Sequence, residues 1–149
     1  MTQAAIVPIG VSIIGGYLGT GKTTLINHLL RNAEGRRIAV LVNEFGELPI
    51  DADLIEGDTQ EGFISLAGGC ICCSYGSDLM DALMQLPELA TPPEHVLIEA
   101  SGVALPGAIA VSIGLLPAFR VDGTVVLVDA QTVLERASDR YLAAVSYTH

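Results

Sequence analysis

Basic side chains are scarce in this chain of 149 residues, in which Lys and Arg number 7, Asp and Glu number 17, and the formal net charge is −10. An electrostatic grip on nucleic acid or on anionic lipid needs clustered Lys and Arg, so we expect neither nucleic acid nor a membrane surface as a partner. Lys22 is the sole lysine, and it lies in a glycine-rich segment where a phosphate would need a cation.

Targeting signals and a disulfide framework are also missing. The N-terminal residues carry no basic segment, and the apolar stretch after them is short and interrupted by glycine, so we expect no signal peptide, no membrane span and a cytoplasmic location. The 3 cysteines are an odd number and lie close together at positions 70, 72 and 73. Such a cluster is more typical of metal or redox chemistry than of a disulfide scaffold.

Short apolar runs alternate with segments of helical periodicity. Strands are predicted over Val11–Ile14, Ile38–Val42, Phe63–Leu66, Val96–Ile98 and Val121–Val128. Helices are predicted around Leu25–Leu30, after an N-cap at Ser77, and around Val133–Ala144, while Asn43–Glu61 is predicted to be a long surface loop with a helical turn near Leu54. This alternation predicts a three-layer α/β domain with a mainly parallel sheet.

Gly16-Tyr17-Leu18-Gly19-Thr20-Gly21-Lys22-Thr23 fits the phosphate-loop pattern G-x-x-x-x-G-K-T between a predicted strand and a predicted helix. The glycines Gly16, Gly19 and Gly21 let backbone N–H groups face phosphates, and the helix N-terminus adds partial positive charge. Lys22 is expected to neutralise the β- and γ-phosphates, and the Thr23 hydroxyl to bind Mg²⁺.

An acid at the end of a neighbouring strand would complete a magnesium site. Glu99 ends the predicted strand Val96–Ile98 and is our candidate, whereas we interpret Asp129, which ends a later strand, as an ordinary carboxylate. Gly102 follows Glu99 in a flexible turn and could sense the γ-phosphate through its N–H group.

Cys70, Cys72 and Cys73 follow two glycines, which predicts a tight turn that brings three sulfurs onto one soft cation. Three thiolates would fill three tetrahedral positions around Zn²⁺ or Co²⁺ and leave the fourth open. The alternative is that the cysteines are small buried apolar residues. His28 and His95 have no ligand neighbour in sequence, and we expect each to be a surface or helix-packing residue rather than a metal ligand.

Four segments, GGYLGTGKTTLINHLL, VNEFGELPID, LAGGCICC and IEASGVALP, occur in the order found in CobW-like metal-centre GTPases, a family related to urease and hydrogenase accessory proteins. The chain resembles that family from Val11 to about Leu142. The resemblance implies a P-loop GTPase domain with GTP, Mg²⁺ and Zn²⁺ or Co²⁺ as ligands and a metal-dependent client protein as partner, and it is compatible with a homodimer. Its matching positions are the nucleotide loop Gly16–Thr24, including Thr20, switch I at Asn43–Asp51, the metal site at Cys70, Cys72 and Cys73, and Walker B with switch II at Glu99–Gly102.

The sequence departs from the family pattern at Pro49, Gly69 and Leu105, and it carries no Asn-Lys-x-Asp guanine-reading motif. Guanine preference is therefore implied by the resemblance alone. Three other functions stay open: an ATP-dependent P-loop kinase with structural cysteines, a P-loop iron–sulfur carrier, and a regulatory nucleotide binder without turnover. The acidic residues Glu44, Glu47 and Asp51 fit either a solvated loop or a place near a metal.

The C-terminal residues carry two unusual features. The chain stops within an expected helix, and Val145-Ser146-Tyr147-Thr148-His149 back-translates to the transposon mosaic end used as a sequencing adapter. We therefore expect residues 1–144 to be the N-terminal part of a longer GTPase, truncated in its C-terminal part, and residues 145–149 to be a non-native tail.

Overall fold

A computed structural model describes residues 7–42, 50–60, 63–74, 79–102 and 104–138. Within these ranges one sheet of seven strands runs in the order β3-β4-β5-β2-β6-β1-β7. The strands are β1 (Ile9–Gly16), β2 (Ile38–Val42), β3 (Ile55–Gln60), β4 (Phe63–Leu66), β5 (Ile71–Ser74), β6 (His95–Glu99) and β7 (Phe119–Leu127). The helices are α1 (Lys22–Arg31), α2 (Leu79–Gln85), α3 (Pro106–Ile113) and α4 (Val133–Ser138), with short 3-10 turns at Ala52–Leu54, Ala67–Gly69 and Leu86–Glu88.

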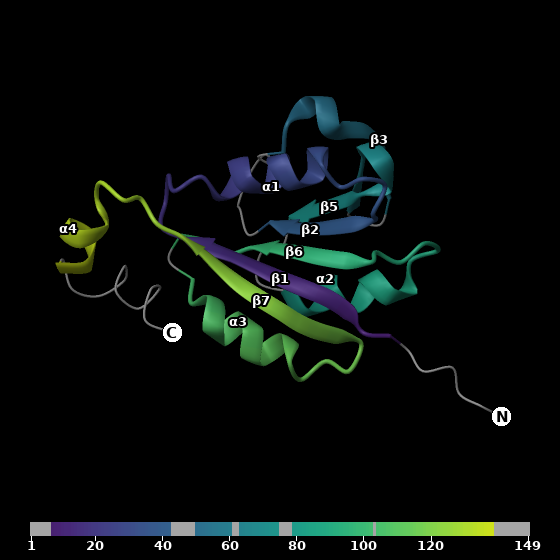
Figure 1. The fold of residues 1–149 in the computed structure, drawn as a ribbon. Coiled ribbons are helices and arrows are strands. Elements are labelled where there is room, and N and C mark those ends of the chain that lie inside the picture. The colour runs from purple at the N-terminus through teal and green to yellow at the C-terminus, as the bar shows by residue number, and fades with distance from the viewer. Residues whose placement is uncertain (1–6, 43–49, 61–62, 75–78, 103, 139–149) are drawn as a thin grey trace.

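The sheet is parallel from β5 through β2, β6 and β1 to β7, and antiparallel where β3 and β4 extend it. Helix α1 covers one face, and α2 and α3 cover the other (Figure 1). This arrangement confirms the predicted three-layer α/β fold. None of the helices in the described ranges is long and apolar enough to cross a membrane.

Two apolar cores lie on the two faces of the sheet. Side chains alternate between the faces along a strand, so Ile13 packs in the core under α2 and α3 while its neighbour Ile14 packs in the core under α1. Strand β2 is buried along its whole length, because it lies at the centre of the sheet and helices cover both of its faces.

Several predicted elements are confirmed, and two predictions are wrong. Strands β2 and β4 have the predicted bounds, and a helical turn occurs at Ala52–Leu54. The segment Asn43–Glu61 is not a loop throughout, because β3 forms within it and pairs with β4. The tight turn predicted across the cysteines is limited to Gly68 and Gly69, since Ile71–Ser74 forms a strand between β2 and β4. Residues 43–49, the N-cap at Ser77 and the tail 145–149 lie outside the described residues.

Candidate functional site

The glycine-rich loop lies between the carboxyl end of β1 and the start of α1, as its sequence pattern predicts. Gly16, Gly19 and Gly21 have φ angles of 136°, 76° and 92°, a region that side-chain-bearing residues rarely adopt. A Cβ atom on Gly16 would also lie 2.6 Å from the carbonyl oxygen of Leu127 on β7. The loop therefore depends on glycine for its backbone path as well as for close packing against the neighbouring strand.

Lys22 is folded beneath this loop. Its side chain is buried, and Nζ donates hydrogen bonds to the carbonyl oxygens of Gly16, at 3.0 Å, and of Tyr17, at 3.2 Å. The Thr20 hydroxyl donates to the same Tyr17 carbonyl at 2.7 Å and holds the loop closed. Gly21 supplies no side-chain cap to α1, so the first N–H groups of the helix keep their capacity to bind an anion. A buried ammonium and a helix N-terminus on one concave loop fit a polyphosphate.

Thr23 and Glu99 meet at the carboxyl ends of β1 and β6, which are hydrogen-bonded neighbours. The Thr23 hydroxyl donates to the two carboxylate oxygens of Glu99 at 3.0 and 3.2 Å, and Glu99 is only 4% exposed. A hydroxyl and a buried carboxylate beside a phosphate loop are the oxygen donors that Mg²⁺ prefers, so the residues present fit that ion.

Gly102 lies directly against the phosphate loop. A Cβ atom there would come within 2.9 Å of both the backbone nitrogen and Cγ of Leu18. Only a residue without a side chain allows this approach, which brings the turn after β6 to the loop. Thr24, the last residue predicted for the nucleotide loop, is exposed at the start of α1.

The three cysteines do not lie on one face of the sheet. Cys70 and Cys72 are buried and pack in the core under α1, and the Cys70 thiol donates a 3.4 Å hydrogen bond to the carbonyl oxygen of Arg36. Cys73 is half-buried against the core of the opposite face. Among the described residues no group of three or more Cys, His, Asp or Glu side chains is placed to hold a metal ion. The predicted role of the thiols as ligands thus finds no preformed site in this conformation.

The two adjacent thiols on β5 are poor metal ligands as they stand. Burial raises the pKa of Cys72 to about 12, with added contributions from the neighbouring Cys73 and from Glu99. Burial also raises the pKa of Cys73. Both groups are therefore protonated near neutral pH, and a metal would have to displace their protons.

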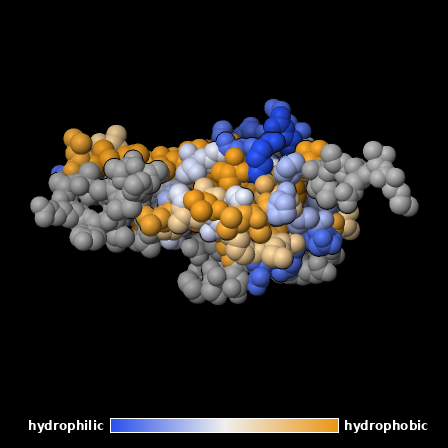
Figure 2. All heavy atoms as spheres, turned by 90° about the horizontal axis from the view of Figure 1, so that it is seen from below, coloured by the Kyte–Doolittle hydropathy of each residue, from blue (hydrophilic) through white to orange (hydrophobic). Residues whose placement is uncertain are grey.

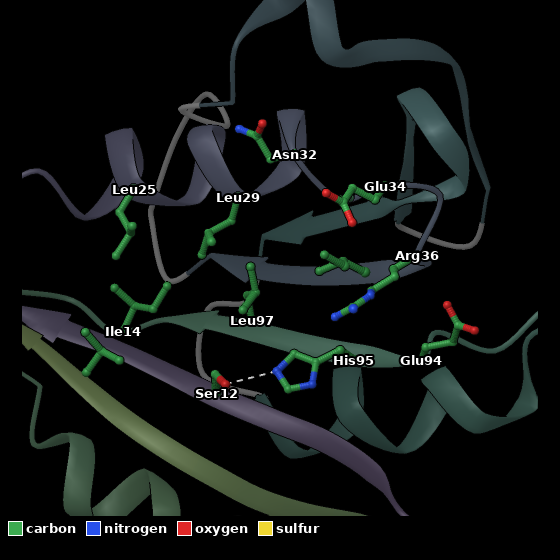
Figure 3. Close-up of a pocket in the computed structure, with 13 residues that line it drawn as sticks. Ser12, Ile14, Leu25, Leu29, Asn32, Glu34, Arg36, Glu94, His95 and Leu97 are labelled. Carbon is green, nitrogen blue, oxygen red and sulfur yellow. Dashed lines mark hydrogen bonds between the residues drawn. The ribbon is translucent and has the colours of Figure 1, made fainter.

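A hollow of about 690 Å³ lies between α1 and the sheet (Figure 3), and none of the loop residues 16–24 lines it. Its walls are mainly apolar, and on its floor Ser12 Oγ and His95 Nε2 share a hydrogen bond of 2.9 Å. His95 Nδ1 lies 3.8 Å from Asp122 on β7, and burial lowers the pKa of the imidazole. Sequence reasoning missed this cluster, because its members lie on three strands and follow no motif.

The first strand of the parallel part of the sheet leads through a glycine loop with positive φ angles and a buried lysine into a helix. The neighbouring strand ends in a buried carboxylate. These features together define a P-loop nucleotide-binding domain. Comparison with protein families matches residues 10–146 to the description "CobW/HypB/UreG, nucleotide-binding domain". The chain belongs to this family.

Individual relatives agree with that membership. The chain is 39% identical over 133 residues to the zinc chaperone CobW of a Sinorhizobium species, covering 84% of this chain and 38% of the relative. It is 40% identical over 131 residues to the zinc chaperone YjiA of Escherichia coli, covering 83% and 41%. The fission yeast zinc-regulated GTPase metalloprotein activator 1 is 32% identical over 135 residues, with 85% of this chain and 33% of that protein covered.

Solved structures show the same likeness. The crystal structure of Zn(II)-bound YjiA GTPase from E. coli superposes with a TM-score of 0.74 at 35% identity and covers 92% of this chain and 45% of that one. A Zn(II)-bound triple mutant of YjiA gives a TM-score of 0.75 at 33% identity, with the same coverage. The chain thus spans about two fifths of the length of the bacterial zinc chaperones and of the solved chains that it matches.

Proposed function

We propose that this chain is the nucleotide-binding part of a GTP-hydrolysing metallochaperone that binds zinc, cobalt or a similar transition metal and transfers it to a client protein. The single observation that carries the proposal is the convergence of Lys22, Thr23 and Glu99 on the glycine-rich loop. The zinc chaperones and the metalloprotein activator among the relatives support the choice of GTP and of zinc.

In this proposal each residue at the loop has a distinct task. Lys22 exchanges its contacts with the carbonyl oxygens of Gly16 and Tyr17 for the β- and γ-phosphates, and the N–H groups of Gly19 to Thr24 surround the phosphate chain. Thr23 and Glu99 would hold Mg²⁺, and the bound ion would supply positive charge beside the phosphates. Gly102 sits close enough to the loop to report the γ-phosphate to α3.

The transition metal is the cargo, and its proposed ligands are Cys70, Cys72 and Cys73. Since Cys72 and Cys73 lie on opposite faces of β5, all three thiolates can reach one ion only after this short strand leaves the sheet locally. Such opening costs hydrogen bonds and buried apolar contact, so the metal site would form when a ligand or client favours the open strand. The metal site in this proposal is therefore not rigid, and the bound nucleotide changes how readily it forms.

Phosphate release from GTP and from ATP tests the nucleotide half of the proposal. We expect Mg²⁺-dependent turnover of GTP, which the Lys22→Ala variant lacks. Faster turnover of ATP than of GTP would favour the kinase alternative, and turnover in the Lys22→Ala variant would remove the phosphate-loop assignment. An iron–sulfur chromophore in the purified protein would instead favour the carrier alternative.

A further inference from the structure

Polar contacts fasten α1 to the segment Ile50–Leu54. The backbone N–H of Asp51 donates a 3.2 Å hydrogen bond to Asn27 Oδ1, and Asn27 is only 8% exposed. The Arg31 guanidinium reaches Asp51 Oδ2 at 2.8 Å and the two oxygens of Asp53 at 3.0 Å each. This contact holds the pKa of Asp53 below its usual range. We call these four residues the α1 clip.

Apolar contacts continue the clip toward the cysteines. Ile50 and Leu54 flank the clipped residues, are 6% and 7% exposed, and belong to the core under α1. That core also contains Cys70 and Cys72, which are each 1% exposed. The position of the segment Ile50–Leu54 relative to α1 is therefore part of the packing around two of the proposed metal ligands.

The clip lies on the same stripe of α1 as the magnesium ligand. Thr23, Asn27 and Arg31 are spaced four residues apart, so they lie one above another along the helix. Thr23 contacts Glu99 on β6, whereas Asn27 and Arg31 both contact the segment Ile50–Leu54, through Asp51 and Asp53. In the proposed function the Thr23 hydroxyl contacts the Glu99 carboxylate when Mg²⁺ is absent and Mg²⁺ when it is bound. The N-terminal end of this stripe therefore has two states.

We propose that Asn27 and Arg31 are positioning residues that transmit the state of the nucleotide from Thr23 along α1 to the segment Ile50–Leu54 and so to the core around Cys70 and Cys72. This inference rests on the proposed function. A change of a few tenths of an ångström at Thr23 moves a rigid helix as a unit, and the clip makes the segment follow it. The packed core beneath the segment then favours either the closed form, in which β5 is paired in the sheet, or the open form, in which β5 has left it.

The test measures Zn²⁺ affinity in two nucleotide states with a competing chromophoric chelator. In the wild-type chain with Mg²⁺, we expect the affinities with GDP and with a non-hydrolysable GTP analogue to differ by about tenfold, a common size for coupling between two sites. In Asn27→Ala and in Arg31→Gln the difference should fall below about twofold, while the nucleotide affinity stays within about twofold of wild type. Arg31→Lys should be intermediate, because it keeps the charge but loses the planar fork.

Two matched variants control for loss of a surface contact. Asn32→Ala removes an asparagine of the same helix region that bonds only within the helix end, to the His28 carbonyl, and Arg120→Ala removes an exposed Arg–Asp pair on β7. Both should keep the tenfold difference. If the wild type shows it and the two clip variants keep it, the clip is overturned while the proposed function stands; if the wild type shows none, both are overturned.

A second readout does not depend on metal or nucleotide. The amide hydrogen of Asp51 should exchange slowly in wild type and at least about tenfold faster in Asn27→Ala, since that variant removes its hydrogen-bond acceptor. Equal exchange rates in the two proteins would overturn the clip directly. Asn27 is buried, so Asn27→Ala could fold poorly. Arg31 is exposed, and Arg31→Gln then serves as the variant for the affinity test.

Discussion

The Thr23 hydroxyl donates a 3.0 Å hydrogen bond to a carboxylate oxygen of Glu99, a residue 76 positions later in the chain. The contact joins the first turn of α1 to the end of β6 and is made possible by the parallel pairing of β1 with β6. It assembles a hydroxyl and a buried carboxylate beside the glycine-rich loop.

Replacing Glu99 with Gln should remove the benefit that Mg²⁺ gives to GTP binding. The amide keeps the size and an acceptor for Thr23 but loses the charge, so the Mg²⁺-dependent gain in affinity should fall by at least about tenfold, as expected for loss of a contact to a charged group. Calorimetric titrations with and without Mg²⁺ measure the gain. Affinity without Mg²⁺ should be unchanged, and an undiminished gain in the variant would contradict the role of Glu99.

Replacing Lys22 with Ala should weaken magnesium–GTP binding by at least about tenfold, because a charge-assisted hydrogen bond contributes about 1.5–3 kcal/mol and the chain has no second lysine to take its place. The control is Arg120→Ala, which removes an exposed cation from β7. Calorimetry on both variants should show loss in the first only. Retained affinity in Lys22→Ala would contradict the placement of phosphates at this loop.

Gly102 and Gly107 offer a matched pair of glycine substitutions. Ala at Gly102 brings Cβ within 2.9 Å of the Leu18 backbone, so the loop must shift and GTP affinity should fall severalfold. Ala at Gly107, in α3, meets nothing within 4 Å and should stabilise the fold by about 0.4–1 kcal/mol through a less flexible unfolded chain. Urea unfolding and GTP titration of both variants separate the effects. A Gly102→Ala protein with normal GTP affinity would show that the contact with Leu18 has no functional role.

The elements that sequence reasoning predicted well are those whose local pattern and tertiary context agree. The continuous apolar run Ile38–Val42 is too short for a helix and suits a strand buried on both faces, and the phosphate loop is specified by local backbone requirements. Strand β3 was missed because its sequence, IEGDTQ, is polar and contains a glycine, and it exists only through pairing with β4. Strand β5 was missed because its cysteines favoured interpretation as a metal loop.

Some residues of the candidate site could likewise be predicted from the sequence, and others could not. The positions of Lys22 and Thr23 at the loop follow from the phosphate-loop pattern, and those of Glu99 and Gly102 from their place at and after the end of an apolar strand, while their roles stay predictions. The opposite orientation of Cys72 and Cys73 follows only from the strand pairing of β5, which connects residues far apart in sequence. Ser12, His95 and Asp122 could be recognised only after β1, β6 and β7 were placed side by side, although a serine in an apolar strand was a weak signal.

Acidification should destabilise the fold through His95. Burial lowers the pKa of its imidazole, Asp122 opposes this shift, and Arg120 and Arg36 add to it. The pKa of His95 in the folded protein lies below its unfolded value of about 6.5. The contribution of neutral His95 to the free energy of unfolding is therefore fully present above that pH and is lost as the pH falls from there to the folded pKa. The loss is no more than about 1.4 kcal/mol per pH unit.

Urea unfolding at pH 7.5 and at pH 5.5 measures this loss. In His95→Gln the decrease in stability between the two pH values should be smaller than in wild type. His28→Gln, which replaces an exposed histidine of α1, is the control and should behave like wild type. If His95→Gln and wild type lose the same stability, the half-buried imidazole of His95 is not the source.

Cobalt spectroscopy tests the central claim, that the thiols of this nucleotide-binding domain take up a transition metal, most directly. Titration of the wild-type chain with Co²⁺ in the presence of Mg²⁺ and a non-hydrolysable GTP analogue should produce thiolate-to-cobalt charge-transfer bands and tetrahedral d–d bands. These bands should vanish in Cys72→Ser and be much reduced in Cys73→Ser, although the two side chains lie on opposite faces of β5 in the closed form. Unchanged bands in Cys72→Ser, or none in wild type, would contradict the account.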